Sequence, residues 1–210
     1  MSEVVNDIVR QRYSDIQISS FVTAFAGMNM SLDEITYLTE AMIESGKQLD
    51  WDTPTVGDKH SLGGLPGNRT TPIVVAIAAS QGITIPKTSS RAITSPAGTA
   101  DTMETITRVN LDPEEIRDVV EAENGCFVWG GTAELSPADD ILIQVERSLD
   151  IDSEGQMVAS ILSKKVAAGS THVVLDMPVG ETAKVRSQEA VDSLSETFES
   201  VADAIGLELK

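Results

Sequence analysis

The stretch VGDKHSLGGLPGNRTTPIVVAIAASQGITIP, residues 56–86, decides the fold. It begins with a short polar, glycine-rich loop, and Thr71-Pro72 then provides a helix start with proline in the first turn. The apolar run at 73–79 predicts a helix that ends at Gly82, and the β-branched residues at 83–86 predict a short strand. A loop, a helix and a strand in this order are typical of an α/β domain.

Outward from this stretch, strands and helices continue to alternate. Further helices are predicted at 101–109, from Asp112-Pro113 onward, and at 138–145, 155–168 and 188–205, with strands at 126–129 and 172–176. This alternation predicts a largely parallel sheet. The first fifty residues instead predict helices only, with a capping box in SLDE at 31–34, so we expect a second, smaller helical part.

Composition restricts the function classes. The 210 residues suffice for one or two domains, and the 41% hydrophobic share suffices for a core. Thirty-three acidic residues against fifteen basic ones give a net charge of −18, which argues against binding to nucleic acid or to an anionic membrane. Neither a membrane-spanning run nor a secretory signal is visible in the sequence, so we expect a cytoplasmic protein.

The acidic residues are spread along the chain rather than collected in a tail. Such a diffuse carboxylate surface favours a protein that works in concentrated salt, where repulsion is screened. The alternative is an ordinary acidic cytosolic protein. One cysteine, Cys126, excludes a disulfide framework or a cysteine zinc site, and two histidines exclude a histidine-rich metal site, so we expect no metal.

Two polar segments follow predicted elements of the sheet. DKHSLGGLPGNRTT, at 58–71, combines basic and hydroxylic residues with three glycines, and TSSRAITSPAGTAD, at 88–101, is rich in hydroxyl groups. Ligands of open α/β sheets collect beyond the carboxyl ends of the strands, and hydroxyls with Lys59 and Arg91 suit a phosphate group. The alternative for both segments is an ordinary polar surface loop.

A third segment lies near the start of the helix at 155–168. Asp150, Asp152 and Ser153 precede this helix, where a carboxylate or hydroxyl most often serves as a cap. Ser160 and Lys164 are four residues apart and therefore share one helix face. This face is either part of a site or solvated surface.

These segments together resemble the thymidine phosphorylase family of pyrimidine nucleoside phosphorylases, over nearly the whole chain. The similarity is strongest in DKHSLGGLPGNRTT, in SSRAITSPAGTADTMET at 89–105, and in PADDILIQVERSLDID at 137–152 followed by ASILSKK. The family pattern S-G-R-x-L-x-x-T-x-G-T-x-D is altered to SSRAITSPAGTAD, and the loop KHSLGGLPGN is one residue longer than its bacterial counterpart. Both differences resemble the archaeal AMP phosphorylases, whose additional N-terminal and C-terminal domains this sequence lacks, so the chain resembles a fragment.

The resemblance implies a set of site residues. Phosphate would be bound by Lys59, Ser61, Ser89 and Thr99, and Asp152 would be the catalytic proton donor. The nucleotide would be bound by a larger set, namely Gly64, Ser90, Arg91, Ala92, Ile93, Thr94, Ser95, Thr99, Ser160, Lys164 and Lys184.

The resemblance also implies a fold and an assembly. The expected fold class is α/β: a small helical domain at 1–54 and 137–168, plus a largely parallel α/β phosphate-binding domain at 55–136 and 169–210, as in nucleoside phosphorylases and phosphoribosyltransferases, with an incomplete sheet. A homo-oligomer, dimer or larger, is expected. The apolar stripe at 18–25 is a candidate contact, with intrachain core as the alternative.

The expected reaction is phosphorolysis of AMP, with CMP and UMP as further candidates, to a free base and ribose 1,5-bisphosphate. Inorganic phosphate is the co-substrate, and no cofactor is expected. A thymidine or pyrimidine nucleoside phosphorylase and an inactive truncated remnant are the alternatives. Anthranilate phosphoribosyltransferase shares the broad architecture but normally needs magnesium.

Overall fold

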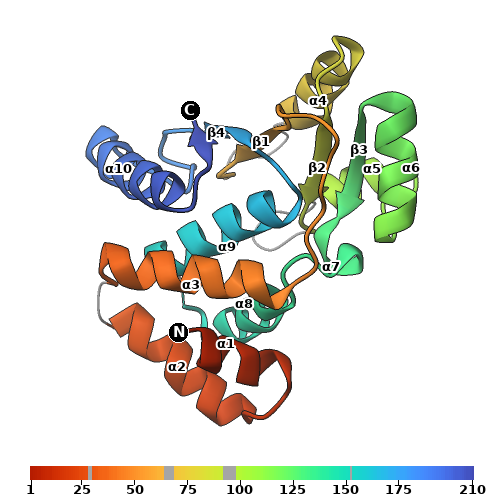
Figure 1. Ribbon diagram of the computed structural model, residues 1–210. Coiled ribbons are helices and arrows are strands. Elements are labelled where there is room, and N and C mark those ends of the chain that lie inside the picture. The colour runs from red at the N-terminus through yellow and green to blue at the C-terminus, as the bar shows by residue number, and fades with distance from the viewer. Residues whose placement is uncertain (28–29, 64–68, 92–97, 152) are drawn as a thin grey trace.

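The computed structural model describes residues 1–27, 30–63, 69–91, 98–151 and 153–210. It contains a helical part and a part with parallel strands. In Figure 1 the helical part lies below the strands. Helix α9 (Glu154–Ala167) lies between the helices of the first part and the strands of the second. Among the described residues, no helix is long and apolar enough to cross a membrane.

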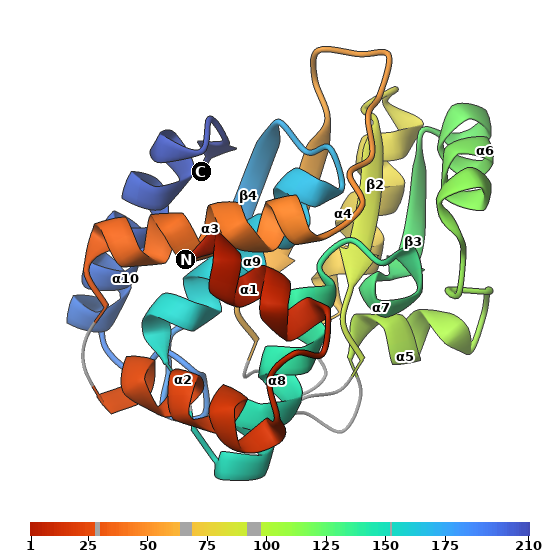
Figure 2. The ribbon, with the colours of Figure 1, turned by 60° about the horizontal axis from the view of Figure 1, so that its bottom comes forward.

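The helical part is built around a core shared by five helices. These are α1 (Ser2–Val9), α2 (Asp15–Gly27), α3 (Leu32–Ser45), α8 (Pro137–Leu149) and α9. Val22, Leu38, Met42 and Leu142 are all fully buried in this core. Figure 2 shows α3 crossing in front of α9, so segments more than a hundred residues apart pack together. Val22 belongs to the apolar stripe at 18–25, so part of this stripe is intrachain core.

The sheet consists of short parallel strands. Its strands are β1 (Gly57–Ser61), β2 (Ile85–Ser89), β3 (Gly125–Trp129), β4 (His172–Asp176) and β5 (Glu208–Leu209). The pairings β1–β4, β4–β5 and β2–β3 are parallel, and a single bridge between Val56 and Thr84 joins the two groups. The resulting order is β3-β2-β1-β4-β5, in which the chain reverses its direction of travel between β1 and β4. Open α/β sheets bind ligands at such a reversal point, beyond the carboxyl ends of the strands.

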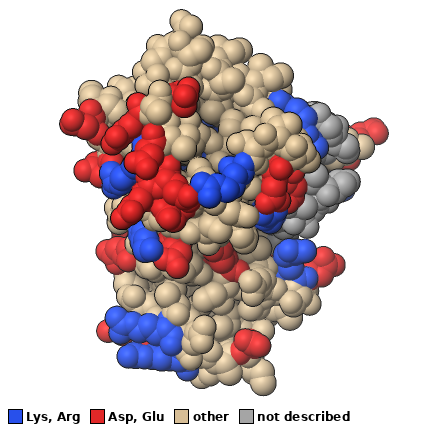
Figure 3. Space-filling model, turned by 90° about the vertical axis from the view of Figure 1, so that its right-hand side faces the viewer, with Lys and Arg blue, Asp and Glu red and all other residues tan. Residues whose placement is uncertain are grey.

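The remaining helices surround the strands. They are α4 (Thr70–Ser80), α5 (Thr99–Glu104), α6 (Pro113–Glu123), α7 (Gly130–Ala133) and α10 (Gln188–Ala204). Helix α4 is apolar on nearly every side, yet of its residues only Thr71 and Val75 are buried, and Ile73 is 60% exposed. The face of the molecule on which α6 lies carries a group of acidic side chains (Figure 3).

Most expected elements are confirmed, including the α/β class, the parallel strands and the capping box of Ser31 and Glu34. Two expectations were wrong. The segment 57–61 forms β1 instead of a loop, because its backbone pairs with β4 along its whole length and its charged residues find partners. The predicted helix at 101–109 is shorter, since α5 ends at Glu104 and a turn follows. The proposed domain boundaries stay predictions.

Candidate active site at the carboxyl edge of the sheet

Three strands end at the same edge with polar or charged residues. Ser61 is the last residue of β1 and pairs in register with Asp176, the last residue of β4. Ser89 is the last residue of β2. Ser61 and Ser89 each follow the bridge pair of Val56 and Thr84 by five residues, so both serines lie at the carboxyl edge where β1 and β2 adjoin.

Lys59 presents its ammonium group at this edge. Its Nζ lies 2.9 Å from a carboxylate oxygen of Asp176, and it donates to the hydroxyls of Thr70 and Thr71 at 3.1 and 3.2 Å. The two threonines open α4, so the lysine connects β1, β4 and the start of that helix. The side chain of Lys59 is only 8% exposed, and a buried ammonium of this kind attracts an anion more strongly than a solvated one.

Ser61 and Ser89 share a property that two other described serines, Ser136 and Ser170, also have. Both hydroxyl oxygens are buried, and neither has a hydrogen-bond partner among the residues that the structure describes. Buried polar groups are normally paired, and leaving one unpaired costs about 1–3 kcal/mol. Two such hydroxyls at one edge of a sheet therefore fit a site that binds a ligand rich in acceptor oxygens.

The second predicted loop ends close to Ser89. Thr99 is the first residue of α5, and the amide of Ala100 donates to the carbonyl oxygen of Ser90 at 3.4 Å. This bond places the start of α5 beside the end of β2. Arg91 binds the carboxylate of Glu104 through two hydrogen bonds, of 2.6 and 2.8 Å, and its guanidinium lies 4.7 Å from the centre of the Trp129 ring. The arginine thus anchors the loop to α5 and β3.

Helix α9 brings two predicted residues together. Lys164 Nζ donates to Ser160 Oγ at 3.0 Å, which confirms that the pair shares one face, and it forms an ion pair of 2.7 Å with Asp139 of α8. Asp139 is almost completely buried. Burial, with Asp139 as the second cause, raises the pKa of the neighbouring Asp140 above its ordinary value. Ser153 caps the start of α9 through the amide of Gln156.

His60 adjoins Lys59 in β1, and its ring is desolvated. Desolvation lowers the pKa of His60 well below 6.5, and the cations of Lys165, Lys87, Lys164 and Lys59 lower it further. The ring is therefore neutral at pH 7. These lysines come from β1, β2 and α9, and each forms an ion pair with a carboxylate: Lys59 with Asp176, Lys164 with Asp139, and both Lys87 and Lys165 with Asp58.

The structure also contains site residues that the sequence reasoning missed. Asp176 partners Lys59, and its place at the end of a predicted strand was the signal that could have identified it. A buried ion cluster joins Asp58 to Lys87 and Lys165. Cys126 is buried as expected, and burial raises the pKa of its thiol to about 12, so the thiol is unreactive near neutral pH.

Several predicted residues lie outside the described part of the chain. These are Asp152 and the nucleotide-binding candidates Gly64, Ala92, Ile93, Thr94 and Ser95. Lys184 is described and exposed, in the turn between β4 and α10. Their roles stay predictions.

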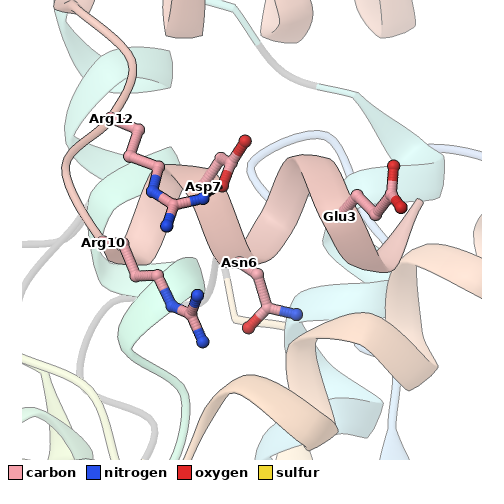
Figure 4. A pocket seen from close by; sticks show the side chains of 5 residues that line it. All are labelled: Glu3, Asn6, Asp7, Arg10 and Arg12. Carbon is pink, nitrogen blue, oxygen red and sulfur yellow. Dashed lines mark hydrogen bonds and ion pairs between the residues drawn. The ribbon is translucent and has the colours of Figure 1, made fainter.

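A cavity of about 300 Å³ lies elsewhere, against α1 of the helical part. It is lined by Glu3, Asn6, Asp7, Arg10 and Arg12 (Figure 4). Two of these residues, Arg12 and Asp7, form an ion pair of 2.8 Å. None of these residues belongs to the predicted site.

Nearly the whole chain is similar in sequence to known proteins. A protein of Chelativorans sp. named "Putative thymidine phosphorylase" is 58% identical over 207 residues, which cover 99% of this chain and 41% of the relative. A Legionella pneumophila protein of the same name is 59% identical over 99% of this chain and 40% of its own length. The chain thus spans about two fifths of the length of these relatives, which are bacterial. The archaeal AMP phosphorylase branch stays a prediction.

Solved structures confirm the fold. Anthranilate phosphoribosyltransferase from Thermus thermophilus superimposes with a TM-score of 0.77 at 20% identity, over 96% of this chain and 58% of that one. The Saccharomyces cerevisiae enzyme gives a TM-score of 0.75 at 16% identity, over 98% of this chain and 57% of that one. Residues 1–46 match the helical bundle domain of a glycosyl transferase family, and residues 53–205 match its a/b domain. The chain therefore belongs to this glycosyl transferase family.

Proposed function

We propose that this chain carries the phosphate-binding and nucleotide-binding walls of a pentosyltransferase that cleaves a glycosidic bond with inorganic phosphate. The observation that carries the proposal is the pair of buried hydroxyls of Ser61 and Ser89, which have no partner among the described residues and lie at the sheet edge where Lys59 contacts Asp176. A phosphate ion offers acceptor oxygens to both hydroxyls and negative charge to the lysine. Family membership and the names of the relatives support the same class of reaction.

The reaction needs two walls. On the sheet side, phosphate attacks C1′ of the sugar, so a C1′–O bond forms while the C1′–N bond breaks. The electron pair of the broken bond leaves with the base, which departs readily only when a general acid protonates it. The resemblance assigns this proton to Asp152, which immediately precedes the N-cap of α9. The resemblance also assigns nucleotide binding to Lys164 and Ser160, which are hydrogen-bonded to each other on α9.

Lys59 gains a further partner in this scheme. Without phosphate, its ammonium is neutralised by Asp176 and solvated by two threonine hydroxyls. An arriving phosphate joins this group from the side of Ser61, and the threonines keep the ammonium in position. Orienting and partly neutralising the nucleophile in this way lowers the barrier without a metal.

Two substrates compete within this proposal. The altered motif SSRAITSPAGTAD and the longer loop favour AMP, with CMP and UMP as further candidates, and ribose 1,5-bisphosphate as product. The names of the bacterial relatives favour a thymidine or pyrimidine nucleoside phosphorylase equally well.

A base-release assay tests the proposal and separates the substrates. The chain, alone and within a version extended to the length of its relatives, is incubated with AMP, adenosine, thymidine or uridine, with and without phosphate and with a metal chelator. We expect phosphate-dependent release that survives the chelator. Faster release from AMP than from adenosine identifies a nucleotide phosphorylase, and the reverse identifies a nucleoside phosphorylase. Release that needs magnesium or ignores phosphate contradicts the proposal, and no release from either version identifies a non-catalytic protein.

A further inference from the structure

A buried ion cluster links the two walls of the site. The carboxylate of Asp58, on β1, lies 3.3 Å from Lys87 Nζ on β2 and 2.8 Å from Lys165 Nζ on α9. The three side chains are 0%, 5% and 2% exposed. Two strands of the sheet and the main helix of the opposite wall therefore meet at one carboxylate.

Each member of the cluster adjoins a predicted ligand-binding residue. Asp58 precedes Lys59 and accepts a 2.6 Å hydrogen bond from the backbone amide of that lysine. Lys87 lies two residues before Ser89 on β2, and Lys165 follows Lys164 on α9. Side chains alternate along a strand, so Asp58 faces away from the side of the sheet on which Lys59 lies. The carboxylate of Asp58 therefore lies on the opposite side of β1 from Lys59 and Ser61, whereas Lys87 shares its side of β2 with Ser89.

The cluster lowers the stability that the same space could provide, so a role in positioning the site explains its presence. Burying two ammonium groups against one carboxylate involves a desolvation penalty that hydrophobic residues of similar size would avoid. Burial, together with the nearby Lys165, lowers the pKa of Lys87 from 10.5 to about 7. An exposed ion pair could not fix three elements in this way, because long surface side chains remain mobile.

We propose that Asp58 is a positioning residue: through Lys87 and Lys165 it fixes β1, β2 and α9 relative to one another, so that Lys59, Ser61 and Ser89 converge on one phosphate. This inference rests on the proposed function. It assigns a role to three residues that need not touch the substrate, and it predicts that phosphate affinity depends on them.

Isothermal titration with inorganic phosphate, below the melting temperature of every variant, tests the inference. The variants are Lys87→Met, which leaves Asp58 and Lys165 as a one-to-one pair, and the double variant Asp58→Asn/Lys165→Met, which removes one charge of each sign. Lys47→Met is the matched control, because it breaks the 2.6 Å ion pair with Glu134, whose partners are 58% and 62% exposed. Affinity is measured per folded molecule, so a purely structural role would change the melting temperature and leave the dissociation constant unaltered.

We expect phosphate affinity about fivefold weaker in Lys87→Met and at least tenfold weaker in the double variant, with the Lys47→Met control within twofold of wild type. Wild-type affinity in either cluster variant overturns the inference and leaves the proposed function standing. A wild-type chain that does not bind phosphate overturns both.

Discussion

The hydroxyls of Ser61 and Ser89 have an energetic consequence that separates function from stability. Both are buried without partners among the described residues, so each destabilises the unliganded protein. In the double variant Ser61→Ala/Ser89→Ala, we expect the free energy of unfolding to stay level or to rise by up to about 1 kcal/mol, while phosphate affinity falls at least tenfold. Chemical denaturation and phosphate titration measure the two quantities.

Ser170→Ala is the matched control for this pair. Its hydroxyl is also buried and unpartnered in the described part of the chain, but Ser170 precedes β4 and lies at the opposite edge of the sheet. It should leave phosphate affinity unaltered. Equal losses of affinity in the double variant and in Ser170→Ala would show that the effect is not local to the site.

Lys87 makes stability depend on pH. Its pKa is about 7 in the folded protein and 10.5 ordinarily, chiefly because it is buried. Between these values the unfolded chain binds more protons than the folded one, so the contribution of this lysine to stability rises with pH from about 7 and levels off above about 10.5.

Urea unfolding at pH 7, 8 and 9 measures this dependence. Relative to Lys87→Met, the wild-type free energy of unfolding should increase by as much as about 1.4 kcal/mol per pH unit. Parallel pH profiles for the two proteins would mean that the lysine titrates normally.

Among the elements, α6 depends most clearly on local sequence. Asp112 accepts hydrogen bonds from the amides of Glu114 and Glu115, both at 2.9 Å, and Glu115 bonds back to the amide of Asp112. Asp112→Ala should lower the free energy of unfolding by about 1 kcal/mol, because two amides of the first turn lose their acceptor. Asp118→Ala, at an exposed position of the same helix, should change it by less than about 0.5 kcal/mol. Equal losses of unfolding free energy in the two variants would show that the Asp112 cap does not stabilise α6.

The elements differ in how well the sequence predicted them. Helices α3 and α6 were predicted because their caps and apolar spacing are local signals. Strand β1, with the sequence GDKHS, has the local pattern of a polar loop, since a strand of charged residues is stable only when distant side chains neutralise it. Those partners, Lys87, Lys165 and Asp176, come from β2, α9 and β4.

The difference between local signals and distant partners also explains which parts of the candidate site the sequence predicts. The family resemblance predicts Lys59, Ser61 and Ser89 as phosphate ligands, and the structure places the two serines at adjoining strand ends. The cluster around Asp58 could not be predicted, because ion pairs between residues 29 and 107 positions apart leave no local pattern in the sequence.

At the scale of the whole molecule, charge is the dominant feature. The net charge is −18, and acidic side chains gather on the face shown in Figure 3. Like charges at this density repel one another, and salt screens the repulsion over about 10 Å at 0.1 M. The melting temperature should therefore rise steadily from 0.05 to 2 M potassium chloride, measured by circular dichroism. A melting temperature indifferent to salt would contradict the expected salt adaptation.

The account depends on one claim: an inorganic phosphate binds where β1 and β2 end. A crystal structure of the chain grown with phosphate tests this claim most directly. The account predicts phosphate oxygens within hydrogen-bond distance of Ser61 Oγ, Ser89 Oγ and Lys59 Nζ. An empty sheet edge at saturating phosphate, with Lys59 still bound only to Asp176, Thr70 and Thr71, would contradict it.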